Sequence, residues 1–212
     1  MEIIRKRTRY IFGNFGLSIR NQEPLFRKVF PKISLFQTIL ISLIGTILIS
    51  ILSQVKFYLP DNPVPVTLQT FGVLTIGGFL GWRWGLVSIL TYYLIGALGL
   101  PVFANGGGGF DYVFQGVTGG YLLGFILATF LVGYLYQRGW NNGKILWGML
   151  VGSIFIYVPA LIWLSIFDFS WPPEGQLLEK ALYPFIPGDL IKLILASLVI
   201  TGINNFVNKK DV

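Results

Sequence analysis

Long apolar runs separated by short polar breaks occupy the chain from residue 33 onward. A transmembrane helix needs about 20 predominantly apolar residues, with a range of about 17–25. Six runs are candidates on this criterion: 33–55, 66–80, 84–100, 119–136, 145–167 and 188–207. The run 66–80 is the shortest, so we expect it either to tilt little or to be partly re-entrant. The pattern predicts an all-α integral membrane protein, a bundle of six transmembrane helices.

The composition supports lipid as the main solvent of this chain. Apolar residues make up 54% of the 212 residues and charged residues 12%, whereas a soluble domain carries about 25% charged residues. The sequence contains no cysteine and no histidine. Disulfides, thiolate catalysis, imidazole bases and Cys/His metal sites are therefore excluded, and we expect no cofactor.

The basic residues are concentrated before the first apolar run. Eight of them lie in the segment 1–32: Arg5, Lys6, Arg7, Arg9, Arg20, Arg27, Lys28 and Lys32. Such a segment can bind nucleic acid, but beside a membrane span we favour a cytoplasmic anchor at anionic lipid. With six spans, Arg83, Arg138, Lys144, Lys209 and Lys210 fall on the same side as this segment. The positive-inside rule then predicts that both termini are cytoplasmic.

Two charges lie inside the last apolar run. Asp189 and Lys192 are three residues apart, which places both on one helix face. A charge at bilayer depth costs about 2.5–3.5 kcal/mol, so it faces a partner or a wet cavity. One alternative is a self-satisfied ion pair that caps the helix. We favour a binding site, because Asp supplies acceptors and Lys supplies donors to a ligand that carries both N–H and oxygen groups.

The loop after the third run carries four consecutive glycines, residues 106–109, preceded by Asn105. Glycines let a backbone approach a ligand closely, and Asn105 offers a donor and an acceptor. The alternative is a flexible connection between helices. A further segment, GWNNGKI at 139–145, lacks the spacing and the Ser or Thr of a P-loop. ATP hydrolysis by that route is therefore excluded.

Small hydroxyl residues recur every fourth position along the first run: Ser34, Thr38, Ser42, Thr46 and Ser50. Small residues let helices approach closely in lipid. From the spacing alone, packing against the protein's own helices is favoured over docking of another membrane protein.

Four ordered motifs resemble the BioY family, the biotin-binding S components of energy-coupling factor (ECF) transporters. They are VPVTLQT at 64–70, GLPVFAN at 99–105, TGGYLLGF at 118–125 and PFIPGDLIK at 184–192. The resemblance implies a six-helix fold with a biotin pocket open to the outside. It also implies partners: a transmembrane coupling protein and two cytoplasmic ATPases, with the hydroxyl stripe of the first run as a docking face. The chain would then be a basic segment, 1–32, and a transmembrane substrate-binding domain, 33–212.

Carried onto this chain, the resemblance implies a site made of Asp189, Lys192, Asn105, Phe103 and Tyr121. Asp189 would accept the ureido N–H groups, and Lys192 would donate to the ureido oxygen or hold a carboxylate. Phe103 and Tyr121 would be walls against the apolar ring. We therefore expect a transport subunit without catalytic activity in the plasma membrane, with biotin and the lipid bilayer as partners and no nucleic acid.

Three alternatives remain open at this point. The chain can be an S component for another vitamin, such as riboflavin or thiamine. It can be a membrane enzyme that uses Asp189 as a base, although no nucleophile or metal cluster accompanies that residue. It can also be a scaffold without a ligand.

Overall fold

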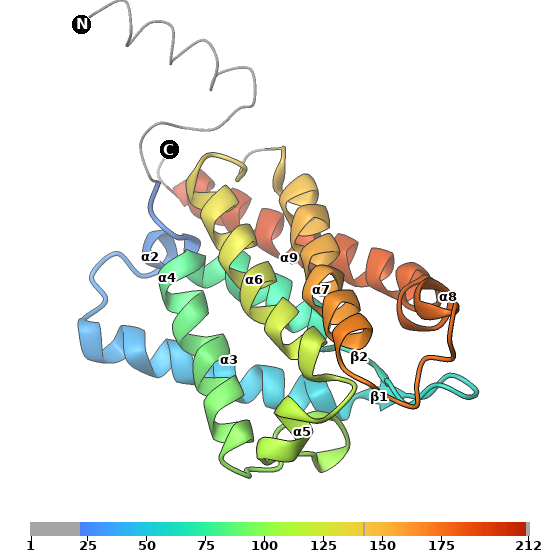
Figure 1. Ribbon diagram of the computed structural model, residues 1–212. Coiled ribbons are helices and arrows are strands. Elements are labelled where there is room, and N and C mark those ends of the chain that lie inside the picture. The colour runs from blue at the N-terminus through green and yellow to red at the C-terminus, as the bar shows by residue number, and fades with distance from the viewer. Residues whose placement is uncertain (1–21, 142, 211–212) are drawn as a thin grey trace, which may run out of the picture.

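The computed structural model describes residues 22–141 and 143–210, which form a helical bundle (Figure 1). Within this part, five helices are long and apolar enough to cross a membrane. They are α3 (Leu35–Gln54), α4 (Gln69–Ala97), α6 (Gly119–Gln137), α7 (Ile145–Ile166) and α9 (Ile186–Lys210), the last of which continues a stretch that starts with α8. Shorter elements connect them: α2 (Leu25–Val29), β1 (Lys56–Phe57), β2 (Val66–Thr67), η1 (Ala104–Gly106), α5 (Phe110–Phe114), α8 (Leu177–Ala181) and η2 (Tyr183–Phe185).

Helix α4 turns back on itself at Gly81. This residue has φ 72° and ψ 178°, which is not helical. The side chain of Gln69 donates a hydrogen bond of 2.6 Å to the Tyr92 hydroxyl, whereas a straight helix would separate these residues by about 35 Å. Figure 1 shows the reversal between the teal first arm and the green second arm. The two arms match the predicted runs 66–80 and 84–100, so the chain is an all-α membrane protein with five to six candidate spans.

The glycine at this reversal is required for two reasons. A positive φ disfavours residues with a Cβ. In addition, a Cβ at Gly81 would lie 2.5 Å from Gln137 Oε1 and 2.8 Å from Pro24 Cβ. The Gly-Trp-Arg break in the sequence is therefore a tight turn packed against other segments.

The hydroxyl stripe of α3 packs inside the protein. Thr38, Ser42 and Thr46 are buried. Thr46 Oγ1 donates to the Ser88 carbonyl at 2.9 Å, and Ser88 Oγ donates to the Ser42 carbonyl at 2.7 Å. The stripe therefore joins α3 to the second arm of α4, as the spacing alone favoured. Docking of another protein on it would require displacement of that arm.

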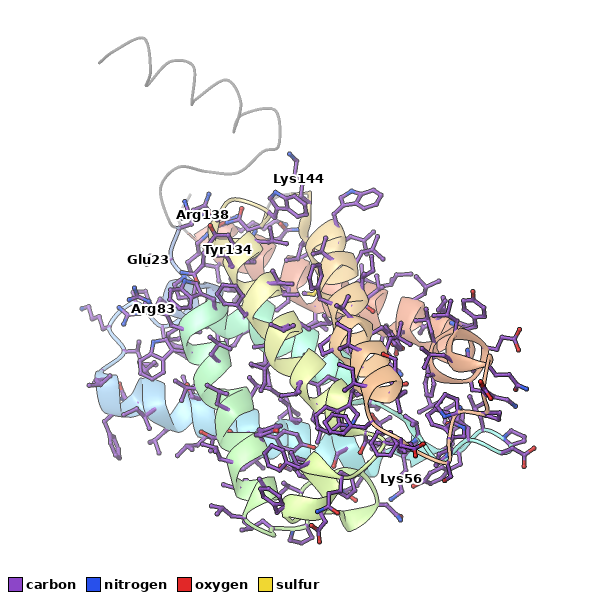
Figure 2. All side chains as sticks on the ribbon, viewed as in Figure 1. Glu23, Lys56, Arg83, Tyr134, Arg138 and Lys144 are labelled. Carbon is purple, nitrogen blue, oxygen red and sulfur yellow. The ribbon has the colours of Figure 1, made fainter. Side chains whose placement is uncertain are left out.

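The two ends of the bundle differ in charge. Figure 2 shows Arg83, Arg138 and Lys144 at one end and Lys56 at the other. Gln22 lies at the first end, where its backbone N–H donates to the Gln137 carbonyl at 2.7 Å. Five of the basic residues predicted to form the cytoplasmic anchor (Arg5, Lys6, Arg7, Arg9 and Arg20) lie outside the described residues.

Part of the segment 1–32 belongs to the core, which the sequence did not predict. Leu25 and Phe26 of α2 are fully buried and join the two main hydrophobic clusters. The basic residues around them concealed this short apolar contact in the sequence.

We predict that Gly81→Ala destabilises the protein by about 2 kcal/mol or more, because a positive φ alone costs about 1–2 kcal/mol and the Cβ also clashes. Gly99→Ala is the matched control: Gly99 has φ 104° but no atom within 4 Å of its Cβ position. Thermal unfolding in detergent should therefore show a larger loss for Gly81→Ala. Equal losses for the two variants would show that the packing around Gly81 contributes nothing.

Candidate functional site

The charged pair of α9 is buried and hydrogen-bonded. Lys192 Nζ lies 2.9 Å from Asp189 Oδ1, and the two residues are 7% and 5% exposed. The hydroxyl of Tyr157, on α7, donates to the other carboxylate oxygen, Oδ2. Both oxygens of Asp189 are therefore bonded, one within α9 and one across to α7. A buried charge is tolerated only when it is paired and hydrogen-bonded in this way.

The pair faces a cavity at the end of the bundle that also holds β1, β2, α5 and α8. About 60 Å³ of this cavity is open to the centres of water molecules. Its walls come from the entry to α4, the loop containing η1, and helices α5, α6, α7 and α9. The lining residues are Val64, Pro65, Thr67, Gln69, Thr70, Phe103, Ala104, Tyr112, Thr118, Tyr121, Leu122, Phe125, Ile156, Tyr157, Phe185, Asp189 and Lys192.

Phe103 is held between two tyrosine rings. Its ring meets Tyr92 edge-on at 5.2 Å between centroids and stacks on Tyr112 at 5.1 Å. Phe103 is fully buried, and it fits only because residue 96 is glycine: a Cβ there would lie 2.1 Å from Phe103 Cζ. The aromatic wall therefore depends on the end of α4.

Tyr121 connects the opposite wall to the loop that carries α8. Its hydroxyl donates to the Ala181 carbonyl at 2.6 Å. Its ring lies edge-on to Tyr157, with centroids 6.0 Å apart. The ring thus adjoins the residue that holds Asp189.

Sequence reasoning missed several polar residues of this cavity. Gln69 receives a hydrogen bond of 3.0 Å from Thr67 Oγ1 on its side-chain oxygen while its amide donates to Tyr92. Thr67, Gln69 and Thr70 stand together at the entry to an apolar run, and that polar cluster was the available signal. Tyr157 had no signal, because it is one aromatic residue within the apolar run 145–167.

Four of the five predicted site residues line the cavity together: Asp189, Lys192, Phe103 and Tyr121. Asn105 is not among the lining residues. It is exposed, with φ 65°, in the loop directly after Phe103 and Ala104. Across residues 22–141 and 143–210, no three His, Cys, Asp or Glu side chains form a metal-binding group. The chemistry available is thus hydrogen bonding and ion pairing to a ligand enclosed by aromatic rings.

The fold and the site together define a multi-pass membrane protein with a polar and aromatic pocket at one end of its bundle. The sequence model of the BioY family matches residues 25–209. The chain belongs to the BioY family.

Named relatives agree with this assignment. The chain is 37% identical over 141 residues to the biotin transporter BioY of Thermotoga maritima, which covers 66% of this chain and 81% of the relative. It is 34% identical over 145 residues to a biotin transporter BioY of Lactococcus lactis, covering 65% and 74%. A crystal structure of the S-component for biotin from an ECF-type ABC transporter superposes with a TM-score of 0.71 at 31% identity, covering 80% of this chain and 92% of that one.

We predict that Lys192→Met destabilises the protein by about 3 kcal/mol, because it leaves Asp189 as a buried carboxylate without a counter-charge. The double variant Asp189→Asn, Lys192→Met should lose less than the sum of the two single changes. Thermal unfolding of the four proteins in one detergent measures this coupling. Additive losses would show that the two charges do not stabilise each other.

Proposed function

We propose that this chain binds biotin and delivers it across the membrane as the S component of an ECF-type transporter. The observation that carries the proposal is the buried Asp189–Lys192 pair, held by Tyr157 in an aromatic cavity, in a member of the BioY family. Donors and acceptors side by side suit a cyclic urea, which presents two N–H groups and one oxygen.

The roles of the site residues follow from their chemistry. Asp189 accepts from the ureido N–H groups, and Lys192 donates to the ureido oxygen or holds the ligand's carboxylate. Phe103 and Tyr121 pack on the apolar ring system. Asn105 adds a donor and an acceptor from the glycine-rich loop, a role that requires the exposed side chain to turn toward the cavity. A site that pairs N–H and oxygen groups rejects ligands without them, because its own polar groups are then left unpaired.

Energy for delivery comes from partners in this proposal. An ECF transmembrane coupling protein and two ATPase subunits complete the transporter, since the sequence carries no P-loop. The similarity to an S-component of an ECF-type ABC transporter supports this assembly. The chain itself acts as a transport subunit and not as an enzyme.

The proposed topology has six spans, with both arms of α4 crossing and both termini in the cytoplasm. Arg83, Arg138 and Lys144 gather at one end of the bundle, as the positive-inside rule requires of the cytoplasmic side (Figure 2). The basic segment 1–32 lies on that side, and residues 33–212 form the transmembrane substrate-binding domain. The cavity then opens outward, at the outer face of the plasma membrane.

We predict that Asp189→Asn combined with Lys192→Ala lowers biotin affinity at least a hundredfold, because hydrogen bonds to charged groups contribute about 1.5–3 kcal/mol each. Isothermal titration of detergent-purified protein measures the affinity. Lys180→Ala is the control, because it removes a cation from α8 at the same end of the bundle. Riboflavin and thiamine should bind neither protein. Unchanged biotin affinity in the double variant would refute the site assignment, and tight binding of another vitamin would identify a different ligand.

We also predict that Gly96→Ala weakens biotin binding about tenfold, because the added methyl forces the Phe103 ring from its position between Tyr92 and Tyr112. Gly202→Ala is the control, since no atom lies within 4 Å of its Cβ position. Titration of both variants tests the wall separately from the charged pair. If Gly96→Ala binds biotin normally, Phe103 is not part of the site.

A further inference from the structure

A second hollow lies at the end of the bundle opposite to the cavity lined by Asp189 and Lys192. About 350 Å³ of it is open to the centres of water molecules. It is formed where the chain before α2, the reversal of α4 and the end of α6 meet. The residues that line it are Gln22, Glu23, Pro24, Arg27, Leu80, Trp82, Arg83, Trp84 and Gln137.

One side chain joins the three segments around this hollow. Gln137 Oε1 accepts from the backbone N–H of Trp82 at 3.1 Å, and Gln137 Nε2 donates to the Gln22 carbonyl at 3.1 Å. The burial of Leu25 and Phe26 fixes the following turn of α2 in the bundle. The hollow is therefore a defined part of the fold, and segments 55 residues or more apart in sequence build it.

Two arginines, Arg27 and Arg83, line this hollow. Within the described part of the chain, neither Arg27 nor Arg83 has a carboxylate oxygen within 4.0 Å. Arg83 stacks over the Trp82 ring at 4.9 Å from its centroid. Glu23 also lines the hollow, so two positive charges and one negative charge leave a net charge of +1. Figure 2 shows Arg83 and Glu23 at the same end as Arg138.

Exposed apolar residues of α4 next to the hollow favour a lipid as its ligand. Val87, Leu90 and Leu94 follow Arg83 at helical spacing and are 38%, 40% and 58% exposed. Residues at that spacing share one helix face, so an apolar track runs from the guanidinium along the second arm. Trp82 and Trp84 stand at its head, and indole rings are enriched at the membrane–water interface.

We propose that this hollow binds the phosphate group of an anionic phospholipid from the leaflet on that side. Arg27 and Arg83 hold the phosphate oxygens, for which the guanidinium fork is matched. An acyl chain lies along Val87, Leu90 and Leu94. The apolar track distinguishes this lipid from a free phosphate ion, because a phosphate ion has no acyl chain to pack against the track. Basic pockets among helices on the cytoplasmic side suit anionic headgroups in this way.

The site rests on the proposed membrane topology only for which leaflet supplies the lipid, and it does not depend on biotin. Its failure and that of the biotin proposal are therefore separable. The test uses the full chain, purified in detergent and titrated with phosphatidylglycerol and with phosphatidylcholine, with bound lipid counted by native mass spectrometry. Phosphatidylglycerol should bind more tightly.

Substitution of both arginines should weaken phosphatidylglycerol binding strongly. Each basic group near a lipid surface contributes about fivefold in affinity, so Arg27→Gln with Arg83→Gln should lose about thirtyfold. Arg83→Gln alone should lose about fivefold, which preserves the test if the double variant does not fold. Lys144→Gln is the matched control, because it removes a cation at the same end but outside the hollow. Its affinity should stay within twofold of the unchanged protein.

Several results would overturn the proposal. Equal loss in Lys144→Gln would mean that general surface charge attracts the lipid. Competition by inorganic phosphate or glycerol phosphate at the same concentration as the lipid would indicate a site for a soluble anion. Binding of phosphatidylethanolamine that Glu23→Gln abolishes would indicate a zwitterionic lipid. Retained phosphatidylglycerol affinity in both Arg83→Gln and the double variant would exclude the two arginines.

Discussion

The reversal of α4 at Gly81 determines what lies at each end of this bundle. Because the second arm returns, its far end and the loop with Phe103 come to the same side as Gln69, where the Gln69–Tyr92 hydrogen bond joins the two arms. At the other end the turn itself packs against Gln137 and Pro24. Without the reversal, the aromatic wall and the charged pair could not share one cavity. The absence of one Cβ thus permits the arrangement of both ends.

The buried triad of Asp189, Lys192 and Tyr157 is satisfied internally yet keeps capacity for a ligand. Each carboxylate oxygen has two acceptor positions, and each accepts one hydrogen bond within the protein. Lys192 has three donors and gives one to Asp189. The pair can therefore receive a ligand without breaking its own contacts. The contacts that stabilise the ligand-free protein at this position are therefore compatible with recognition of a ligand.

The sequence predicted what depends on local pattern and missed what depends on tertiary contact. Run length located the spans, and the Gly-Trp-Arg break located the turn in α4. The spacing of Asp189 and Lys192 predicted a shared face, and the resemblance to the BioY family added Phe103 and Tyr121, which line the same cavity. Tyr157 and Gln69 acquire their roles only from residues that are 32 and 23 positions away. Asn105 was inferred from loop composition and from the resemblance to the BioY family, neither of which determines the direction of an exposed side chain.

One physical rule, that a charge needs either water or a neutralising partner, accounts for the charged residues at three places in the protein. Where water is scarce, Asp189 and Lys192 are paired, since an unpaired charge costs several kcal/mol. At the end lined by Trp82 and Trp84, no carboxylate oxygen of the described residues lies within 4.0 Å of Arg27 or Arg83, and the proposed phospholipid would neutralise them there. On the loop side, Lys56 needs no partner because water solvates it. The place of an unpaired charge in this protein therefore decides what it suggests: in water it means little, whereas beside interfacial tryptophans it supports the proposed phospholipid.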